Sequence, residues 1–360
     1  MHLLVVTSRS DRSETAVYRG LVARGHRVDI LCKPGTPDVD CLRAGGVTCH
    51  PLRLRHRLDL PAALTVRRTL RKLNPDVLYA PRNDSLAVSL FASRTARLPV
   101  VAYRGTVGHI SRWDPACWIT YLHPRVARIA CVSEAVRAYL LGFNLPPTRP
   151  VTIHKGHDVA WYDAMPKPSR ADLNLPQDAF LVGFTGRVRP VKGGDVLLKA
   201  LAKIPRDLNV HLVIVGEIAD KSVHPLIAAL ALRDRVHCLG FRHDAAAVAA
   251  AFDAFAMPSI EREGLPRAAI EAMSQRVAPI VTRVGGMPEL VVDGECGRVI
   301  PPRDVDALAA AITSLARNRP LCRQLGAAAR RRIETHFNIH DTTTKFEALF
   351  TTALREVRTS

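Results

Sequence analysis

The chain has 360 residues, 48% of them hydrophobic and 23% charged, and this composition excludes a disordered or low-complexity chain. The length predicts two domains, each with enough apolar residues to build its own core. The formal net charge is +18, with 51 Lys and Arg residues against 33 Asp and Glu residues.

The positive charge lies mostly in the first half of the chain. Residues 1–157 contain 24 Lys and Arg residues against 10 Asp and Glu residues, whereas the remainder contains 27 against 23. This asymmetry indicates an anionic partner for the first half, which is nucleic acid, a phosphorylated substrate or a membrane face.

Neither targeting nor metal-binding patterns are present in the sequence. The apolar run near the N-terminus is far shorter than that of a signal peptide or of a spanning helix, which needs about 20 residues. We therefore expect a first strand and a cytoplasmic protein. The eight cysteines form no Cys-x-x-Cys pair and no Cys/His cluster at zinc spacing, so neither a metal site nor a redox pair is predicted.

Short apolar runs alternate with helical patterns along the whole chain, which predicts parallel α/β units with helices on both faces of each sheet. In the first half the predicted strands are residues 2–8, 27–33, 46–52, 76–81, 99–105, 128–133 and 150–155. In the second half they are residues 179–186, 211–216, 235–240, 254–259, 278–284 and 297–302.

The predicted fold class is α/β, with two Rossmann-like domains. Residues 1–157 form the first domain and residues 179–335 the second, while residues 158–178, where prolines collect, connect them. Residues 336–360 contain a terminal amphipathic helix, with Asp341 or a following Thr as its N-cap. Its apolar face consists of Phe346, Leu349, Phe350, Ala353, Leu354 and Val357.

In the first half, residues 51–75 combine many cations with regularly spaced leucines. The cations are Arg53, Arg55, Arg57, Arg67, Arg68, Arg71 and Lys72, and the leucines are Leu60, Leu64, Leu70 and Leu73. Such a helix can lie on an anionic bilayer, where each cation contributes about 1 kcal/mol. Equally, it can be a solvated basic face on a helix whose leucines all point inward.

Two cations follow the first strand of the second half. In the stretch GFTGRVRPVKGGDVLL, Arg187 and Lys192 precede Gly193 and Gly194 at the carboxyl end of a predicted strand. Open α/β sheets bind ligands at that edge. The stretch is not a P-loop, because Val191 replaces a required glycine. It suits a diphosphate held by side-chain charge, although a solvated basic loop has the same pattern.

Two carboxylates lie eight positions apart in the stretch SIEREGLPRAAIEAM. Glu263 precedes Gly264, Leu265 and Pro266, and Glu271 lies about a turn inside the helix that follows. Carboxylates in this arrangement can serve as general acid and base, as metal ligands or as acceptors for hydroxyl groups. Metal is the least favoured use because no third ligand is nearby, and a Glu before a helix can also simply complement the helix dipole.

A third segment, TRVGGMPELVVDGECGRVIPPRD, has Gly285 and Gly286 after a strand, and Glu289 opening a short helix. On their own these glycines indicate only a tight turn. Taken together in this order and spacing, the three segments resemble the donor half of glycosyltransferase family 4, retaining enzymes of GT-B architecture. The resemblance covers roughly residues 180–335.

That resemblance implies two Rossmann-like domains facing a central cleft, with the last helix crossing back to the first domain. It also implies that Glu271 binds the nucleotide ribose and that Glu263, with the amides of Gly264, Leu265 and Pro266, holds the donor sugar. Arg187 and Lys192 then clamp the diphosphate. Acids and cations would thus serve opposite ends of one nucleotide-sugar, which is a substrate, and no metal cofactor is expected.

The first half fits the family less closely. Its loop TSRSDRSETA replaces the family's usual Gly-Gly loop, and Asp11 and Glu14 there have the spacing of a capping box. Where the family usually has a cleft histidine, this chain has Arg104, and His109 follows five residues later. Either residue can serve the acceptor side, and His109 is our candidate catalytic residue beside Glu263, although an ordinary surface histidine is the simpler interpretation.

The resemblance implies front-face retaining transfer, in which the leaving diphosphate accepts the proton of the acceptor and Glu263 orients the sugar. The expected acceptor is a glycan or lipid-linked glycan of the cell envelope, such as lipopolysaccharide core, reached at the inner face of the cytoplasmic membrane. A GT-B epimerase or phosphorylase is the nearer alternative. A nucleic-acid-binding protein is remote, because aromatic residues make up only 5% of the chain and no recognition motif is present.

Overall fold

The computed structural model describes residues 1–359, which divide into two compact units. The first unit contains residues 1–156 and 338–359, and the second contains residues 157–337. Residues 158–178, which we expected to form a separate connection, lie within the second unit.

The first unit is built on a seven-stranded, fully parallel sheet with the order β3-β2-β1-β4-β5-β6-β7. Its strands are β1 (His2–Val6), β2 (Arg27–Cys32), β3 (Thr48–Pro51), β4 (Val77–Ala80), β5 (Val100–Arg104), β6 (Val126–Cys131) and β7 (Pro150–Thr152). Its helices are α1 (Arg12–Ala23), α2 (Pro37–Ala44), α3 (Leu60–Leu73), α4 (Asn83–Ala92), α5 (Pro115–Trp118), α6 (Glu134–Leu141) and α15 (Ile339–Thr359).

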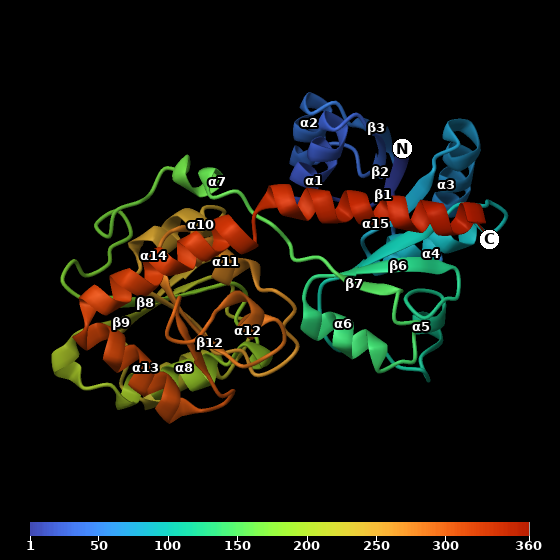
Figure 1. Cartoon of the computed structure of the whole chain (residues 1–360). Helices are drawn as coiled ribbons and strands as arrows, with labels where there is room; N and C mark the ends of the chain where they lie inside the picture. Colours follow the sequence, from blue (N-terminus) through green and yellow to red (C-terminus); the bar gives the residue numbers. More distant parts are fainter. Residues whose placement is uncertain (360) are drawn as a thin grey trace. The chain divides into compact units, whose positions relative to one another are not determined.

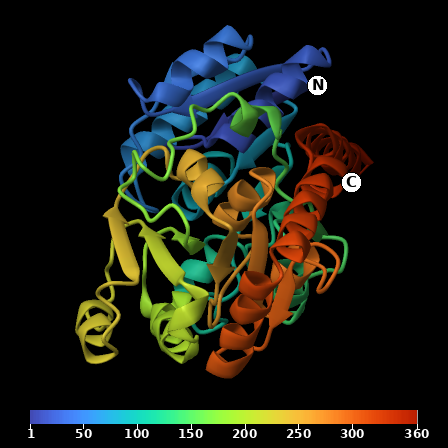
Figure 2. The ribbon, with the colours of Figure 1, turned by 90° about the vertical axis from the view of Figure 1, so that its left-hand side faces the viewer.

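The second unit has a six-stranded, fully parallel sheet with the order β10-β9-β8-β11-β12-β13, visible in Figure 2 as strands that pass from yellow to orange. Its strands are β8 (Phe180–Thr185), β9 (Val210–Val215), β10 (Val236–Gly240), β11 (Ala254–Met257), β12 (Ala278–Thr282) and β13 (Arg298–Ile300). Its helices are α7 (Ala160–Asp163), α8 (Gly194–Lys203), α9 (Val223–Ala229), α10 (Ala245–Val248), α11 (Arg267–Ser274), α12 (Met287–Leu290), α13 (Val305–Arg317) and α14 (Arg319–His336). Three short 3₁₀ helices complete it: η1 (Pro190–Lys192), η2 (Arg206–Leu208) and η3 (Ala249–Ala251).

Every predicted strand overlaps an observed one, so the α/β fold of two Rossmann-like sheets is confirmed. The reason is that the strands of both sheets are buried on two faces, which makes their sequences nearly continuous apolar runs. Core clusters in the second unit lie on both sides of its sheet, one under α8 and α13 and the other under α11 and α14.

Helix α15 completes the core of the first unit, where it packs beside α1 (Figure 1). Phe350 is fully buried, and its ring lies 5.2 Å from that of Tyr79 in an edge-to-face arrangement. The predicted N-cap of this helix was wrong. The side-chain oxygen of Asn338 accepts a 2.8 Å hydrogen bond from the backbone N–H of Asp341, so Asn338 caps the helix three residues earlier.

Helix α3 shows which of its leucines are buried. Its buried face consists of Ala62, Ala63, Val66 and Leu70, whereas Leu60 and Leu64 are more than half exposed. The prediction that the leucines point inward is therefore wrong for Leu60 and Leu64, because the face of α3 that is buried beside α4 carries mainly alanine and valine. Among residues 1–359, no helix is both long enough and apolar enough to cross a bilayer.

Candidate functional site

The topology of the second sheet locates a binding site before any side chain is considered. The strand order reverses between β8 and β11, so the loops that follow these two strands run in opposite directions and leave a crevice at their carboxyl ends. The loop after β8 carries Arg187 and Lys192, and the loop after β11 carries Glu263. These are the segments that the sequence singled out.

Lys192 and Glu263 meet at this point. The Nζ atom of Lys192 lies 2.5 Å from Oε1 of Glu263, and the hydroxyl of Ser259 donates a 2.6 Å hydrogen bond to the same oxygen. The carboxylate is 9% exposed and Ser259 is fully buried. A buried charge needs a partner of this kind, and the pair places an ammonium group and a carboxylate side by side at the edge of the sheet.

Backbone contacts hold the two loops together. The N–H of Ile260 donates a 2.8 Å hydrogen bond to the carbonyl of Val191. Gly193 has a φ of +70°, and a Cβ atom there would lie 2.1 Å from the carbonyl oxygen of Pro258. Only glycine allows both the left-handed conformation and this close approach, so the Gly193 position fixes Lys192 beside Glu263.

The segment after β12 contacts the backbone of the loop that carries Glu263. Gly285 has a φ of +55°, and a Cβ atom there would lie 1.9 Å from the carbonyl oxygen of Glu263. The N–H of Gly286 donates a 2.9 Å hydrogen bond to the carbonyl of Gly264, and the hydroxyl of Thr282 donates one of 2.5 Å to the carbonyl of Ser259. The third segment thus does more than make a tight turn, since it packs under the Glu263 loop.

Glu271 lies in α11, which begins at Arg267, and Pro266 occupies the position just before it. The Glu271 side chain is 18% exposed and pairs with Arg267 at 3.2 Å along the helix. Gly264 and Pro266 are buried and Leu265 is half-buried. The sugar-binding and ribose-binding residues predicted from the sequence therefore occupy one continuous loop and helix start.

Arg187 is the more exposed of the two predicted diphosphate ligands, with 60% of its side chain exposed. It pairs with a different carboxylate from the one that Lys192 contacts. Its Nε lies 3.1 Å from Glu217, which follows β9, and a second contact of 3.2 Å makes the pair bidentate. An exposed pair of this kind contributes little to stability, so the guanidinium can exchange Glu217 for a ligand at low cost.

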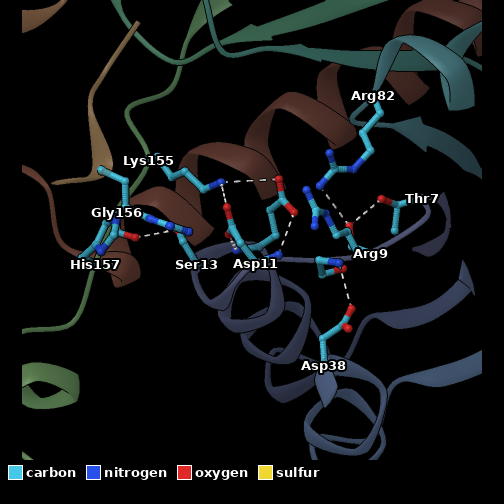
Figure 3. A network of polar contacts seen from close by, with 12 residues as sticks. Thr7, Arg9, Asp11, Ser13, Asp38, Arg82, Lys155, Gly156 and His157 are labelled. Carbon is cyan, nitrogen blue, oxygen red and sulfur yellow. Dashed lines mark hydrogen bonds and ion pairs between the residues drawn. The ribbon is translucent and has the colours of Figure 1, made fainter. Parts of the chain in front are cut away.

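The first unit has its own switch point between β1 and β4. The loop after β1 ends in the predicted capping box, which is confirmed: Glu14 N–H donates to Asp11 at 3.0 Å, and Asp11 N–H donates to Glu14 at 3.1 Å. Figure 3 shows Lys155 directed toward Asp11 and Arg82 directed toward the Arg9 carbonyl, which accepts a 3.3 Å hydrogen bond. These contacts fix the loop that replaces the family's Gly-Gly loop.

The charge of Lys155 is held by this network. Its Nζ contacts Asp11, lies 3.4 Å from Glu14 and lies over the ring of Tyr103. Burial by itself would lower the pKa of Lys155, but Tyr103, Glu14 and Asp11 together raise that pKa well above its usual range. Lys155 therefore stays protonated and acts as a fixed cation under the loop.

Beside this loop the first unit has an open cavity of about 1030 Å³. Segments after β1, β4 and β5 and the start of the α3 loop line it, with residues Ser8, Arg9, Arg57, Pro81, Arg82, Asn83, Asp84, Tyr103, Arg104, Gly105, Thr106, His109, Ile110, Ser111, Asp114 and Tyr121. Four of these residues are arginines. The two carboxylates cap backbone groups, since Asp114 accepts from the N–H of Ala116 and Asp84 from that of Ser85. The cavity thus favours an anionic ligand.

Arg104 and His109 both line this cavity but differ in their surroundings. Arg104 is 5% exposed, lies over the ring of Tyr121 and donates hydrogen bonds to the carbonyls of Thr106 and Gly108. It therefore shapes the loop that carries His109. His109 is exposed, lines the cavity and has a φ of +60°, a conformation that is uncommon outside glycine.

Sequence reasoning missed several residues of these two sites. Ser259, the partner of Glu263, and Glu217, the partner of Arg187, follow β11 and β9 respectively, and a search for polar residues at every strand end would have found them. Arg9 and Arg82 line the cavity, and the Nε of Arg82 is buried without a hydrogen-bond partner in residues 1–359. In that same part of the chain, no group of three His, Cys, Asp or Glu residues is placed to hold a metal ion.

Comparisons with known proteins agree with this arrangement. A family described as Glycosyltransferase Family 4 matches residues 14–161, and one described as Glycosyl transferases group 1 matches residues 167–332. The D-inositol 3-phosphate glycosyltransferase of Stackebrandtia nassauensis is 34% identical over 175 residues, which are 45% of this chain and 39% of that protein. The protein of the same name from Mycobacterium avium is 31% identical over 241 residues, 64% of this chain and 56% of that protein.

The chain thus spans about half the length of the curated relatives it matches. Among solved structures, that of Anabaena HepE in complex with UDP and glucose superimposes with a TM-score of 0.81 at 22% identity, and the match covers 98% of this chain and 100% of that one. This likeness shows that the two chains share a fold.

Proposed function

We propose, because the chain belongs to glycosyltransferase family 4, that it transfers a sugar with retention from a nucleoside diphosphate sugar to a phosphate-bearing acceptor. The observation that carries this proposal is the ion pair between Lys192 and the buried Glu263 at the switch point of the second sheet. A diphosphate needs the cation and a sugar needs the hydrogen-bond acceptor, and here the two groups are adjacent.

The donor is held by the second unit in this proposal. Lys192 and Arg187 neutralise the diphosphate, Glu263 accepts hydrogen bonds from sugar hydroxyls, and Glu271 accepts those of the ribose. The Ser259 hydroxyl occupies one lone pair of Glu263 and fixes its orientation. Solved structures of Anabaena HepE, which has the same fold, are complexes with UDP and with UDP-glucose, and this supports a nucleotide-sugar as the donor here.

Charge develops on the departing diphosphate in front-face transfer. Lys192 stabilises that charge from a site whose geometry Gly193 already fixes, so little reorganisation is needed in the transition state. The leaving phosphate accepts the proton of the acceptor hydroxyl, and no further base is required. Glu263 acts on the sugar by orienting it.

The acceptor is held by the cationic cavity of the first unit. Its four arginines, together with the unpartnered Nε of Arg82, favour a phosphate group, and the curated relatives named above carry inositol 3-phosphate in their names. We place His109 at the acceptor hydroxyl and Arg104 beneath it. The acceptor class is a cell-envelope glycan or lipid-linked glycan, of which lipopolysaccharide core is one member.

We further propose that the reaction takes place at the cytoplasmic face of the membrane. The basic residues of segment 53–72 and the exposed side chains of Leu60 and Leu64 support peripheral contact with anionic lipid. Each cation near such a surface contributes about 1 kcal/mol, and the contribution falls with salt.

The test is turnover and binding of nucleotide-sugars by two variants. Lys192→Ala and Glu263→Ala should each reduce transfer by at least about a hundredfold, the scale of losing a preorganised electrostatic contact, while far-UV circular dichroism stays unchanged. Matched controls are Lys199→Ala, an exposed residue of α8, and Glu261→Ala, a half-buried residue of the same loop as Glu263. Both controls should retain full turnover.

Full activity of either site variant would overturn the assignment. The same assay, run without acceptor, separates transfer from the alternatives considered from the sequence. A sugar altered in the absence of acceptor would indicate an epimerase, and a requirement for free phosphate would indicate a phosphorylase. The relatives named above are transferases by name, so neither alternative is proposed.

A further inference from the structure

A second hollow in the first unit is apolar. It measures about 440 Å³ and lies between the segment that leads into α3, the helix α4 and the turn that precedes β6. Its lining residues are Arg57, Leu58, Asp59, Leu60, Ala63, Ala87, Val88, Leu90, Phe91, Arg94, Ile119, His123 and Arg125. We call it the α3–α4 groove.

The groove exposes large apolar side chains at its mouth. Leu58 is 71% exposed, Leu60 is 59% exposed and Phe91 is 52% exposed, and Ile119 is also exposed. Single exposed apolar residues are normal on a protein surface, but several around one hollow mark a binding surface. The floor is apolar too, because Ala63, Ala87, Val88 and Leu90 are buried there.

Charge at the rim is positive, and the groove's one carboxylate is already used. Asp59 accepts hydrogen bonds from the N–H groups of Ala62 and Arg55, at 3.1 and 2.9 Å, and so caps α3. Arg125 is used as well, since it donates to the carbonyl of Ser93 at 2.6 Å. Arg57 and Arg94 are exposed and supply the positive charge at the mouth.

The groove continues into the cationic cavity through one residue. Arg57 lines both hollows, so a ligand with a phosphate at Arg57 reaches the arginines of the cavity on one side and the apolar floor on the other. A hydrocarbon chain joined to a phosphate matches this arrangement, because its phosphate suits the arginines and its chain suits the apolar floor. A free sugar phosphate would leave the groove empty, and a neutral lipid would leave the arginines unused.

We propose that the α3–α4 groove binds the hydrocarbon chain of a lipid-linked acceptor whose phosphate lies at Arg57. This assignment rests on the proposed function, because the cavity beyond Arg57 is taken to hold the acceptor. In this proposal the acceptor is an anionic lipid, and Leu60 and Phe91 select for the length of its chain.

The experiment measures binding of butyl, hexyl and octyl phosphate to the full chain by calorimetry, below the concentrations at which micelles form. Affinity should rise about fourfold for each methylene added, which is the fold-change for burying a CH₂ group. Inorganic phosphate should bind through the arginines without this gain. UDP-glucose binding is measured on the same samples as a readout of the second unit.

Variants on one helix provide a matched comparison. Leu60→Ser removes a groove residue and should weaken octyl phosphate about tenfold while leaving inorganic phosphate unaffected. Leu64→Ser changes another leucine of α3 that is more than half exposed but does not line the groove. Phe91→Ser removes a second groove residue and should also weaken octyl phosphate, and its control is Phe241→Ser, which changes an exposed phenylalanine of the second unit. Both controls should bind octyl phosphate normally, and thermal melting checks that every variant is folded.

Three results would overturn the inference. The first is an affinity that does not change with chain length. The second is an equal loss in Leu60→Ser and Leu64→Ser, which would indicate a general membrane-facing surface without a chain site. The third is normal octyl phosphate binding by Leu60→Ser and Phe91→Ser. Chain-length dependence without UDP-glucose binding would support the groove and count against the proposed transferase, so the two failures are distinguishable.

Discussion

At the scale of single residues, Glu263 and Asp29 show two ways in which a buried carboxylate finds partners. Glu263 is paired with one cation, Lys192, at the edge of the sheet. A ligand that binds there can take the place of Lys192 as the partner of Glu263. Asp29, in β2, is fully buried and is surrounded by His50 at 2.6 Å, His2 at 2.7 Å and Arg27 at 2.9 Å. Three partners in a closed site indicate a role in stability.

Asp29 therefore predicts an acid-dependent loss of stability. Burial raises the pKa of Asp29, but the hydrogen bonds from His50, His2 and Arg27 outweigh it and bring that pKa below its usual 3.8. A carboxyl with a lowered folded-state pKa stabilises the fold fully above its unfolded pKa. That contribution is lost as pH falls from about 3.8 through the lower folded-state value.

Urea denaturation between pH 7 and pH 3 checks this. Asp29→Asn should be less stable than the native chain by about 1.5–3 kcal/mol at pH 7, the scale of hydrogen bonds to a charged group. The difference should shrink below about pH 4 as the native carboxyl takes up its proton. A difference that stays constant down to pH 3 would show that the charge of Asp29 does not matter.

At the scale of elements, helix α3 shows how one cap can organise a surface. Asp59 accepts from the N–H of Ala62 in the first turn and from the N–H of Arg55 in the preceding loop. The same carboxylate thus starts the helix and bends the segment that carries Arg57 and Leu58. Both of these residues line the α3–α4 groove.

Loss of this cap should therefore have two effects. Asp59→Ala should lower the free energy of unfolding by about 1–2 kcal/mol, as for other N-cap residues, and Asp59→Asn should recover most of it. Chemical denaturation measures the stability. Hydrogen exchange of residues 55–62 should rise in Asp59→Ala, and unchanged exchange there would show that the loop is held by other contacts.

Strands were predictable from the sequence because burial on both faces of a sheet gives a strand a nearly continuous apolar run. All the strands were found this way, and the spacing of Asp11 and Glu14 predicted the capping box. The cap of α15 was not predicted, because Asp341 and Asn338 are both good N-caps and only the path of the preceding chain selects between them.

The sequence singled out Arg187, Lys192 and Glu263 but not the contacts that these residues make. Lys192 and Glu263 are 71 positions apart, and their contact depends on how closely Gly193 lets one loop approach the other. The pairing of Arg187 with Glu217 depends likewise on the alignment of β8 with β9. The cationic cavity collects residues from four separate segments, and no spacing in the sequence brings these together.

At the scale of the whole molecule, two units with separate cores predict two sources of stability. Each unit has its own sheet and its own apolar clusters. A ligand that binds only the folded form stabilises it by about 2.7 kcal/mol at a hundred times its Kd. UDP, held by the second unit in our proposal, should therefore protect that unit first.

Limited proteolysis with mass spectrometry measures this directly. In saturating UDP, cleavage within residues 157–337 should slow by about a hundredfold under conditions where cleavage follows the opening equilibrium. Lys192→Ala should lose this protection. Protection confined to residues 1–156 would indicate that UDP binds the first unit, and this would contradict the assignment of the donor to the second unit.

The position of α15 has a consequence for how the molecule is made. Phe346 and Phe350 fill the centre of the first unit, beside Tyr79, yet they are translated after everything in the second. Translation adds roughly 5–20 residues per second. The core of the first unit therefore lacks Phe346 and Phe350 until α15 is made, by which time all the residues of the second unit have been translated. We therefore expect the first unit to finish folding no earlier than the second, so that nascent chains expose their basic half the longest.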